Sequence, residues 1–193
     1  MPTADTTLFS LNVLKDYVGV KGDAKDVQLS RLADSVTQRI EAFTGRVFVT
    51  RSLVQLYTPS NDTTIYLRHF PVTALTQVRS RQWVGDTPTV IPSTDYDTDL
   101  AHGVLYALWE PFPAQVPNGI EVTYSAGFGV QDAATLPQDV VQASLDWTKF
   151  LYQRQSANLA ALTNITTSGS SISVGSLPKD IQEALQPWRK LRL

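Results

Sequence analysis

Three acidic side chains at alternate positions, Asp95, Asp97 and Asp99, form the group in this sequence whose spacing is nearest to a metal site. A calcium loop of the EF-hand type places carboxylates at its first, third and fifth positions, but it also needs glycine at the sixth and glutamate at the twelfth. Those two places hold Leu100 and Tyr106. We therefore interpret this segment as a solvated acidic turn, and we expect no metal site here.

The segment Gly127-Phe128-Gly129 has the beginning of a phosphate-binding turn, because it follows an apolar strand pattern and precedes a helical one. The dinucleotide-binding fingerprint needs a third glycine, and the P-loop needs a lysine followed by serine or threonine. Neither follows here. We interpret these glycines as the point where the chain leaves a sheet, since glycine tolerates a positive φ.

The residue types that most enzymes use for proton transfer and nucleophilic attack are scarce. The chain has no cysteine and two histidines, His69 and His102, which are far apart in the sequence. No serine lies in a G-x-S-x-G context. Because most general-base, triad and metal schemes need histidine or cysteine, we predict a protein that is not an enzyme and that needs no cofactor. A small hydrolase built on a spatial pair of carboxylates stays a weaker alternative, since such a pair does not show in a sequence.

Composition adds further limits. The net charge is −2 and only 18% of the residues are charged, so no strong positive field would attract nucleic acid. A DNA-binding regulator is therefore a weaker alternative too, because Arg68, Arg79 and Arg81 have no known DNA-binding motif around them. No apolar run is long enough to cross a membrane. Absence of cysteine fits a protein made in a reducing cytoplasm, or one that must survive both redox regimes, and the N-terminus lacks the pattern of a secretion signal.

Helical periodicity occurs in four places. Ser10 is placed to cap a helix over 11–18, and Asp26 to cap a longer one that ends at Gly45. Thr135 and Gln138 form a capping-box pattern before a helix that runs to about residue 155. A short helix follows residue 176, and Pro187 should end or kink it.

Residues 46–126 have a different pattern, in which short runs rich in β-branched residues alternate with turns. Residues 156–176 are rich in serine, threonine, asparagine and glycine, which is typical of a loop or flexible arm. The sequence thus predicts an α+β fold. A helical bundle of about four helices carries an antiparallel β insertion between helices 2 and 3, with a flexible arm before the C-terminal helix.

Six short motifs, in this order along the chain, resemble those of one family. They are residues 11–18 with Lys15 and Tyr17; residues 40–46 ending in Thr44-Gly45-Arg46; Tyr66-Leu67 followed by Pro71-Val72; residues 122–128; Leu136-Pro137-Gln138-Asp139-Val140; and Leu177-Pro178 followed by Leu185, Pro187 and Arg189. In these motifs the chain is similar to the head–tail connector adaptors, or head-completion proteins, of long-tailed phages. The β insertion and the arm are longer than in the smallest members.

The resemblance implies a structural virion protein at the head–tail interface, made in the host cytoplasm. It implies a homo-oligomeric ring, expected to be a dodecamer, whose lumen passes double-stranded DNA without sequence specificity. One face would bind the portal protein and the other a head-closure (stopper) or tail protein. The chain would be a single connector domain over 1–193, with helical parts 8–45 and 135–155, β insertion 46–126, and arm and terminal helix 156–193. A head-closure or tail-completion protein is the nearest alternative, although those are usually β-rich.

Two sets of residues are predicted to make contacts between subunits. The arm and terminal helix have scattered apolar residues and no obvious core of their own to fill, so we predict that they dock on a neighbour or on the portal. The outer faces of helices 2 and 3 are predicted to make ring contacts, through Arg31 and Glu41. The predicted partner-binding residues are Leu177, Ile181, Leu185, Trp188, Arg189 and Lys190.

Overall fold

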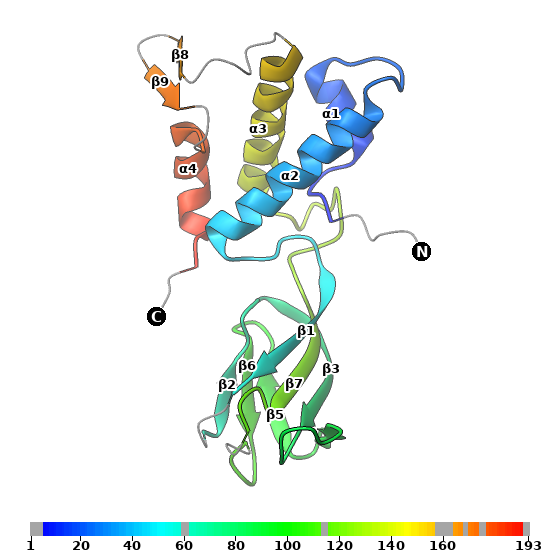
Figure 1. The fold of residues 1–193 in the computed structure, drawn as a ribbon, viewed down its shortest axis with the longest axis vertical. Helices are drawn as coiled ribbons and strands as arrows, with labels where there is room; N and C mark the ends of the chain where they lie inside the picture. Colours follow the sequence, from blue (N-terminus) through cyan, green and yellow to red (C-terminus); the bar gives the residue numbers. More distant parts are fainter. Residues whose placement is uncertain are drawn as a thin grey trace. The chain divides into compact units, whose positions relative to one another are not determined.

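The computed structural model describes residues 6–58, 62–112, 116–156, 164–167, 170–173 and 177–190. Contacts within the chain divide it into two compact units (Figure 1). A helical unit consists of Met1–Arg46 and Gly129–Leu193, and a β unit consists of Val47–Phe128. The predicted α+β fold, with an antiparallel β insertion between helices 2 and 3, is confirmed. That the two units act as one connector domain stays a prediction.

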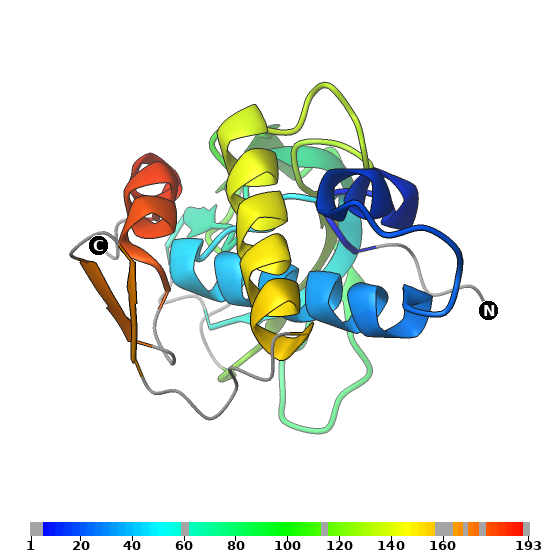
Figure 2. The ribbon, with the colours of Figure 1, turned by 90° about the horizontal axis from the view of Figure 1, so that it is seen from above.

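The helical unit contains α1 (Leu11–Val18), α2 (Asp26–Thr44), α3 (Gln138–Ser156) and α4 (Lys179–Leu185), followed by a 3-10 turn, η2 (Gln186–Trp188). Figure 2 shows α3 lying across α2, with α1 and α4 on either side. Each long helix buries the stripe that its periodicity predicts, because an apolar face is stable only against another element. The fully buried side chains of this core include Leu14, Leu29, Val36, Ile40, Val140 and Leu185.

Local capping signals predict some helix ends and miss others. The Ser10 hydroxyl accepts a hydrogen bond from the Val13 backbone N–H, and Gly45 ends α2 with φ of 70°, as predicted. Asp26 is not the cap of α2 but its first residue, and its carboxylate pairs with Lys15 at 2.9 Å. The prediction that Thr135 and Gln138 form a capping box is wrong as well, because α3 begins only at Gln138. There the side-chain amide of Gln138 donates to the Leu136 carbonyl instead.

The chain beyond α4 is fixed against the C-terminal end of α2. Pro187 lies in the 3-10 turn that ends α4, as predicted. Arg46 Nε then donates to the Trp188 carbonyl at 2.8 Å, and the Lys190 backbone N–H donates to the Thr44 carbonyl at 2.7 Å. The Arg189 guanidinium lies 5.5 Å from the centre of the Phe43 ring. Three contacts therefore hold residues 188–190 against the C-terminal end of α2 and the turn that follows it.

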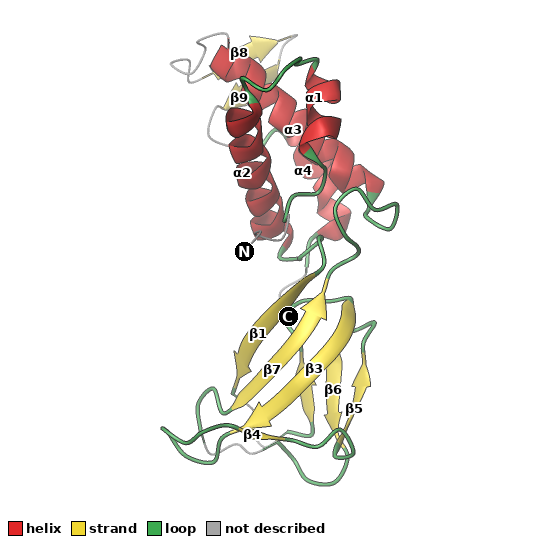
Figure 3. Ribbon diagram, turned by 90° about the vertical axis from the view of Figure 1, so that its right-hand side faces the viewer, coloured by secondary structure: helices red, strands yellow, loops and turns green. Residues whose placement is uncertain are grey.

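The β unit consists of two antiparallel sheets (Figure 3). The strands of the larger sheet lie in the order β1 (Arg51–Tyr57), β7 (Ile120–Ala126), β3 (Val72–Ser80) and β4 (Thr89–Val90). The strands of the smaller sheet lie in the order β2 (Thr64–Tyr66), β6 (Val104–Ala107) and β5 (Tyr96–Asp99). Residues from both sheets share one core, including Ile65, Leu105, Val78 and Val122. The compact antiparallel arrangement predicted for this segment is therefore present as two sheets over a common core.

Tyrosine hydroxyls provide the polar contacts within this core. Tyr57 and Tyr124 both donate to the Gln55 side-chain carbonyl, at 2.8 and 2.9 Å. The same hydroxyls accept hydrogen bonds from the Arg68 and His69 backbone N–H groups. Burial raises the pKa of both tyrosines above its ordinary value. These hydroxyls tie β1 and β7 to the turn that follows β2.

Gly127 marks the exit from β7, as the sequence predicts. Its φ is 143°, and a Cβ there would lie 2.6 Å from the Thr50 backbone. Only glycine fits such a close approach of two backbones.

Part of the predicted arm is a hairpin. β8 (Asn164–Thr167) pairs antiparallel with β9 (Ser170–Ser173), with Ile165 opposite Ile172 in the register. The prediction of a loop over 156–176 is wrong for these two strands. Most of the other arm residues lie outside the described part of the chain.

Candidate partner-binding surface

The acidic segment that the sequence offers as a metal site lies on β5 and the turn after it. Asp99 accepts a hydrogen bond from the His102 backbone, and its other oxygen lies 2.7 Å from His102 Nδ1. These bonds hold the pKa of the Asp99 carboxyl below its ordinary value. Within the described ranges, no three histidine, aspartate or glutamate side chains are grouped so that they could hold a metal ion. The turn is thus closed by an exposed Asp–His pair.

The arginines of the β unit make contacts inside the chain. Arg79 pairs with Glu121 at 3.3 Å, and Arg81 donates to the Asn118 carbonyl at 3.0 Å. The Arg68 guanidinium lies 5.6 Å from the centre of the Tyr57 ring. These contacts give the three arginines partners inside the β unit, which agrees with the absence of a DNA-binding motif around them.

The six predicted partner-binding residues lie on and beside α4, and they divide by exposure. Ile181 and Leu185 are buried in the helical unit, at 7% and 0% exposure. Leu177, Trp188 and Lys190 are half-buried, and Arg189 is exposed. The burial of Ile181 and Leu185 removes the reason given for that prediction, since α4 does fill a core of its own. Partner binding by these residues stays a prediction, and the exposed ones are the accessible candidates.

The two predicted ring contacts lie on α2. Arg31 is exposed and Glu41 is half-buried. They are ten positions apart, close to three helical turns, so they do not form one cluster. Their role in ring contacts stays a prediction.

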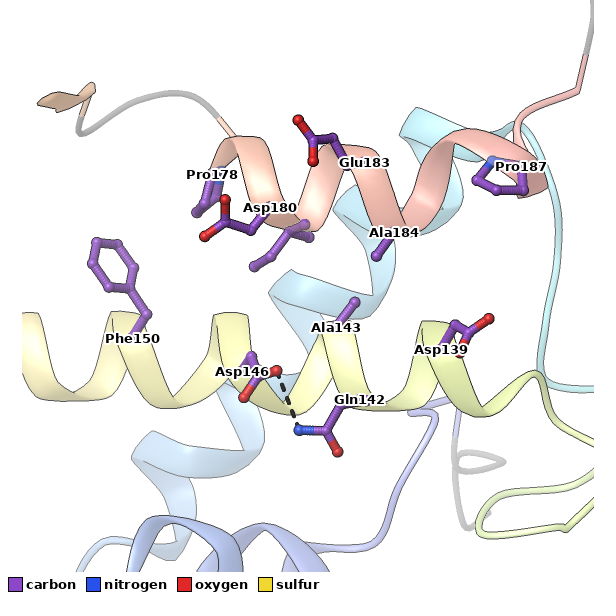
Figure 4. Close-up of a pocket in the computed structure, with 11 residues that line it drawn as sticks. Asp139, Gln142, Ala143, Asp146, Phe150, Pro178, Asp180, Glu183, Ala184 and Pro187 are labelled. Carbon is purple, nitrogen blue, oxygen red and sulfur yellow. Dashed lines mark hydrogen bonds between the residues drawn. The ribbon is translucent and has the colours of Figure 1, made fainter. Parts of the chain in front are cut away.

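A groove between α3 and α4 is the concave surface that sequence reasoning missed. Its volume is about 660 Å³, and Figure 4 shows Ala143 of α3 and Ala184 of α4 pointing toward each other across it. Because both side chains are methyl groups, the facing helices leave space between them. Phe150 and Pro178 lie at one end of the groove, and Asp139 and Pro187 lie at the other.

Four carboxylates line this groove. Asp139 and Asp146 belong to α3, and Asp180 and Glu183 belong to α4. Asp146 accepts hydrogen bonds from Gln142 at 3.2 Å and from the Tyr17 hydroxyl, and the latter bond raises the pKa of Tyr17. Among the described residues, no cation forms an ion pair with any of the four. Within the described part of the chain, the groove therefore combines apolar side chains with four carboxylates that form no ion pair.

A helical-spacing signal for half of this groove was present in the sequence. Residues 139, 142, 143, 146 and 150 recur at the three- and four-residue intervals that place side chains on one helix face. That α4 covers this face could not be known, because the contact joins segments about 40 residues apart.

Exposed large apolar side chains are concentrated on the β unit. Ten of the thirteen among the described residues belong to it, and only Val13, Val27 and Val130 belong to the helical unit. Trp83 and Trp109 are the largest, at 65% and 78% exposure. By contrast, Trp147 of α3 is buried at 4% exposure, so it is a core residue. Within the described ranges, the β unit thus exposes more large apolar side chains than the helical unit does.

Comparison with solved structures finds chains of the same fold in gene transfer agent (GTA) particles. A chain from the "Neck of empty GTA particle computed with C6 symmetry" has a TM-score of 0.71 at 20% identity, with 100% of this chain and 95% of that chain covered. A chain from the "Virion of native gene transfer agent (GTA) particle" gives the same values. A third, from the "Neck of native GTA particle computed with C12 symmetry", has a TM-score of 0.70 at 19% identity, with 100% and 94% covered.

No curated protein matches the sequence. No helix in the described part of the chain is long and apolar enough to cross a membrane. The model of one protein family, described as head completion protein, matches residues 7–191. This match spans both units and all six motifs, and it confirms the resemblance read from them: the chain belongs to the head completion protein family.

Proposed function

We propose that this protein is a structural component of a virion neck, a head–tail connector adaptor that acts by assembly and not by catalysis. The observation that carries the proposal is the family match over residues 7–191. It is supported by the likeness, over the full length of this chain, to chains from the neck of gene transfer agent particles. The scarcity of histidine and the absence of cysteine agree with a role that needs no catalytic group.

The assembly in this proposal is a closed ring of identical subunits. Two of the similar chains come from necks that were computed with sixfold and twelvefold symmetry, and a dodecamer satisfies both. A net charge of −2 limits the repulsion between neighbouring copies, so a ring can form without a counter-charged partner.

The ring in this proposal surrounds a lumen through which double-stranded DNA passes without sequence recognition. A strongly basic lumen would bind phosphates tightly and slow the DNA, since each phosphate contact releases counterions. Arg79 on β3 is already engaged with Glu121, and Arg81, which follows β3, is engaged with the Asn118 carbonyl. Weak phosphate attraction by this chain therefore suits a conduit.

The ring would bind the portal protein on one side and a head-closure (stopper) or tail protein on the other. Two accessible surfaces are available for these contacts. One is the exposed side of α4 and the turn after it, around Arg189. The other is formed by the exposed apolar side chains of the β unit, of which Trp83 and Trp109 are the largest. Arg31 and Glu41 on α2 are proposed as contacts between ring neighbours.

Electron microscopy of the purified protein mixed with its portal tests this function. We expect an added ring, coaxial with the portal, in most particles. A charge reversal at the exposed Arg189 (Arg189→Glu) is expected to reduce occupancy if α4 meets the portal, and Lys21→Glu, an exposed site on the turn before α2, is the matched control. If the wild-type protein adds no ring to the portal at any concentration tested, the adaptor function is wrong.

A further inference from the structure

The groove between α3 and α4 needs an occupant whose chemistry matches an apolar floor and a negative rim. The floor contains Ala143, Ile181 and Ala184, and the rim contains the four carboxylates of the two helices. Among the described residues, none of these carboxylates forms an ion pair. A surface that presents an apolar side chain together with cations complements both parts of such a groove.

The first turns of α2 present such a surface. Val27 is an apolar side chain with 66% exposure, and the cations on either side of it in the sequence, Lys25 and Arg31, are exposed as well. Neither cation forms an ion pair within the described ranges. We call Lys25, Val27 and Arg31 the basic end of α2.

Interactions inside the chain do not account for the positive charge at this end. The two carboxylates nearest in sequence to Lys25, those of Asp23 and Asp26, both lie 2.9 Å from the Lys15 amine. Lys25 is the N-cap residue of α2, but its side chain makes no capping hydrogen bond. A cation at a helix N-terminus is also unfavourable, because the helix dipole is positive there. Both cations are therefore available to a partner.

The groove and the basic end of α2 lie on opposite sides of the helical unit. Figure 2 shows α4 on one side of α3, and α1 with the first turns of α2 on the other. The far end of α2, about 27 Å from its beginning at the helical rise per residue, is the one that meets the segment after α4, through Thr44 and Lys190. Within one helical unit the two surfaces therefore cannot meet. Two copies related by a rotation can join them, and repetition of such a contact closes a ring.

The dimensions of the two surfaces agree. The part of α3 that lines the groove, from Asp139 to Phe150, is about 16 Å long, and the rise from Lys25 to Arg31 is about 9 Å. Val27 can then enter the apolar floor while the two longer cationic side chains stay at the rim. We propose that the groove between α3 and α4 binds the basic end of α2 of a neighbouring copy, and that this contact joins adjacent subunits. The inference rests on the proposed ring and names the surface that Arg31 meets there.

Charge reversal in two separate preparations tests which surfaces meet. One variant carries Lys25→Glu and Arg31→Glu, and the other carries Asp139→Lys, Asp180→Lys and Glu183→Lys, which reverse three of the four rim charges. Each variant alone brings like charges together at every contact, so neither should form a ring on the portal in electron micrographs. A mixture should form rings in which the two variants alternate, and mass spectrometry of these rings should give equal amounts of both. A mixture that stays unassembled where the wild-type protein forms the ring would overturn the proposal.

A matched control separates this contact from a general effect of charge. Arg31→Glu alone should raise the concentration needed for ring formation about tenfold, which corresponds to about 1.4 kcal/mol. Adding Glu183→Lys in the same chain should restore it, whereas adding Asp16→Lys, the same change at an exposed site outside the groove, should not. Asp34→Asn, at an exposed position one turn beyond Arg31, should not weaken assembly, because a carboxylate there repels the rim. Equal restoration by Asp16→Lys and Glu183→Lys would overturn the proposal.

Cysteine cross-linking tests the same contact without charge reversals and without the portal. The natural chain has no cysteine, so introduced pairs have no background. Val27→Cys in one preparation and Ala184→Cys in another should give a mixed disulfide dimer when the two are combined at high concentration. Val130→Cys is the matched control, since Val130 is exposed at 68%, and with Ala184→Cys it should give no dimer. Equal yields of dimer from the Val27 and Val130 pairs would overturn the proposal.

Failure of this inference can be told apart from failure of the proposed function. If the portal acquires its ring and neither alternating rings nor the cross-link are found, the adaptor function stands and the groove proposal is wrong. If no ring forms on the portal and the Val27 pair still cross-links, the contact stands and the adaptor function is wrong.

Discussion

Replacing Leu185 by alanine tests whether α4 is part of the helical core or an appendage that is ordered only by partners. Leu185 has 0% exposure, on a helix that packs against α3. The change removes three carbon groups, which at about 0.8 kcal/mol each corresponds to about 2.4 kcal/mol of lost burial. The cavity left behind raises the usual cost of such a change to about 2–5 kcal/mol.

The free energy of unfolding of the helical unit is the quantity to measure. Urea unfolding followed by the helical circular dichroism signal reports this unit, because the other unit of the chain is built of strands. We expect a lower midpoint for Leu185→Ala at an unchanged slope. Leu177→Ala, at a half-buried position of the same segment, is the control and should cost clearly less.

A cost below about 0.5 kcal/mol, the range of ordinary surface substitutions, would refute this account of α4. It would show that α4 does not contribute to the isolated chain and would restore the interpretation of the terminal segment as an arm. On the structure, deletion of 177–193 should also destabilise the helical unit. Loss of portal binding in such a deletion could therefore not be assigned to a lost contact alone.

Three further outcomes are expected. Gly127→Ala should lower the thermal unfolding midpoint of the β unit much more than Gly85→Ala does. Both positions have a positive φ, but only a Cβ at position 127 would lie 2.6 Å from another backbone. Above about pH 10, the ordinary tyrosine pKa, the β unit should lose stability, because the unfolded chain ionises there while burial keeps Tyr57 neutral when folded. Tyr57→Phe should flatten this pH dependence of the unfolding midpoint, and an unchanged profile would contradict it. Arg31→Glu should lower the fraction of assembled rings in electron micrographs, with no change in the monomer's unfolding midpoint.

Helix caps and turns that depend on residues close together in the sequence could be predicted. Ser10 and Gly45 act through the backbone within a few residues, so their roles could be inferred before any contact was known. The position of Gly127 at a strand exit could be inferred in the same way, but the close approach of the Thr50 backbone that requires glycine there could not. Asp26 and Thr135 show the limit of the same reasoning. A capping side chain competes with other partners, and Lys15, eleven residues before Asp26, holds that carboxylate in an ion pair instead.

The order of strands in a sheet and the packing of helices depend on residues far apart in the sequence, so these features could not be predicted. The larger sheet places β1 beside β7, which pairs Leu53 with Tyr124 across about 70 residues. Alternating apolar residues indicate that a strand has a buried face, but they do not indicate which strand lies next to it. The α3–α4 groove depends on the same kind of information, because Ala143 marks a hollow only when Ala184 lies opposite.

The tryptophans show why the difference between local and distant contacts matters when functional residues are predicted from a sequence. All four are candidates for core or interface anchors on residue type alone, because an indole stabilises either environment. Trp147 occurs in a helical stripe, where periodicity does predict burial, and it is buried. Trp83 and Trp109 lie on turns of the β unit, and nothing local says whether a neighbouring strand covers them. Their exposure is therefore known only from the tertiary structure. Their exposure leaves these two indoles accessible to a partner, and a contact of the β unit through them stays a prediction.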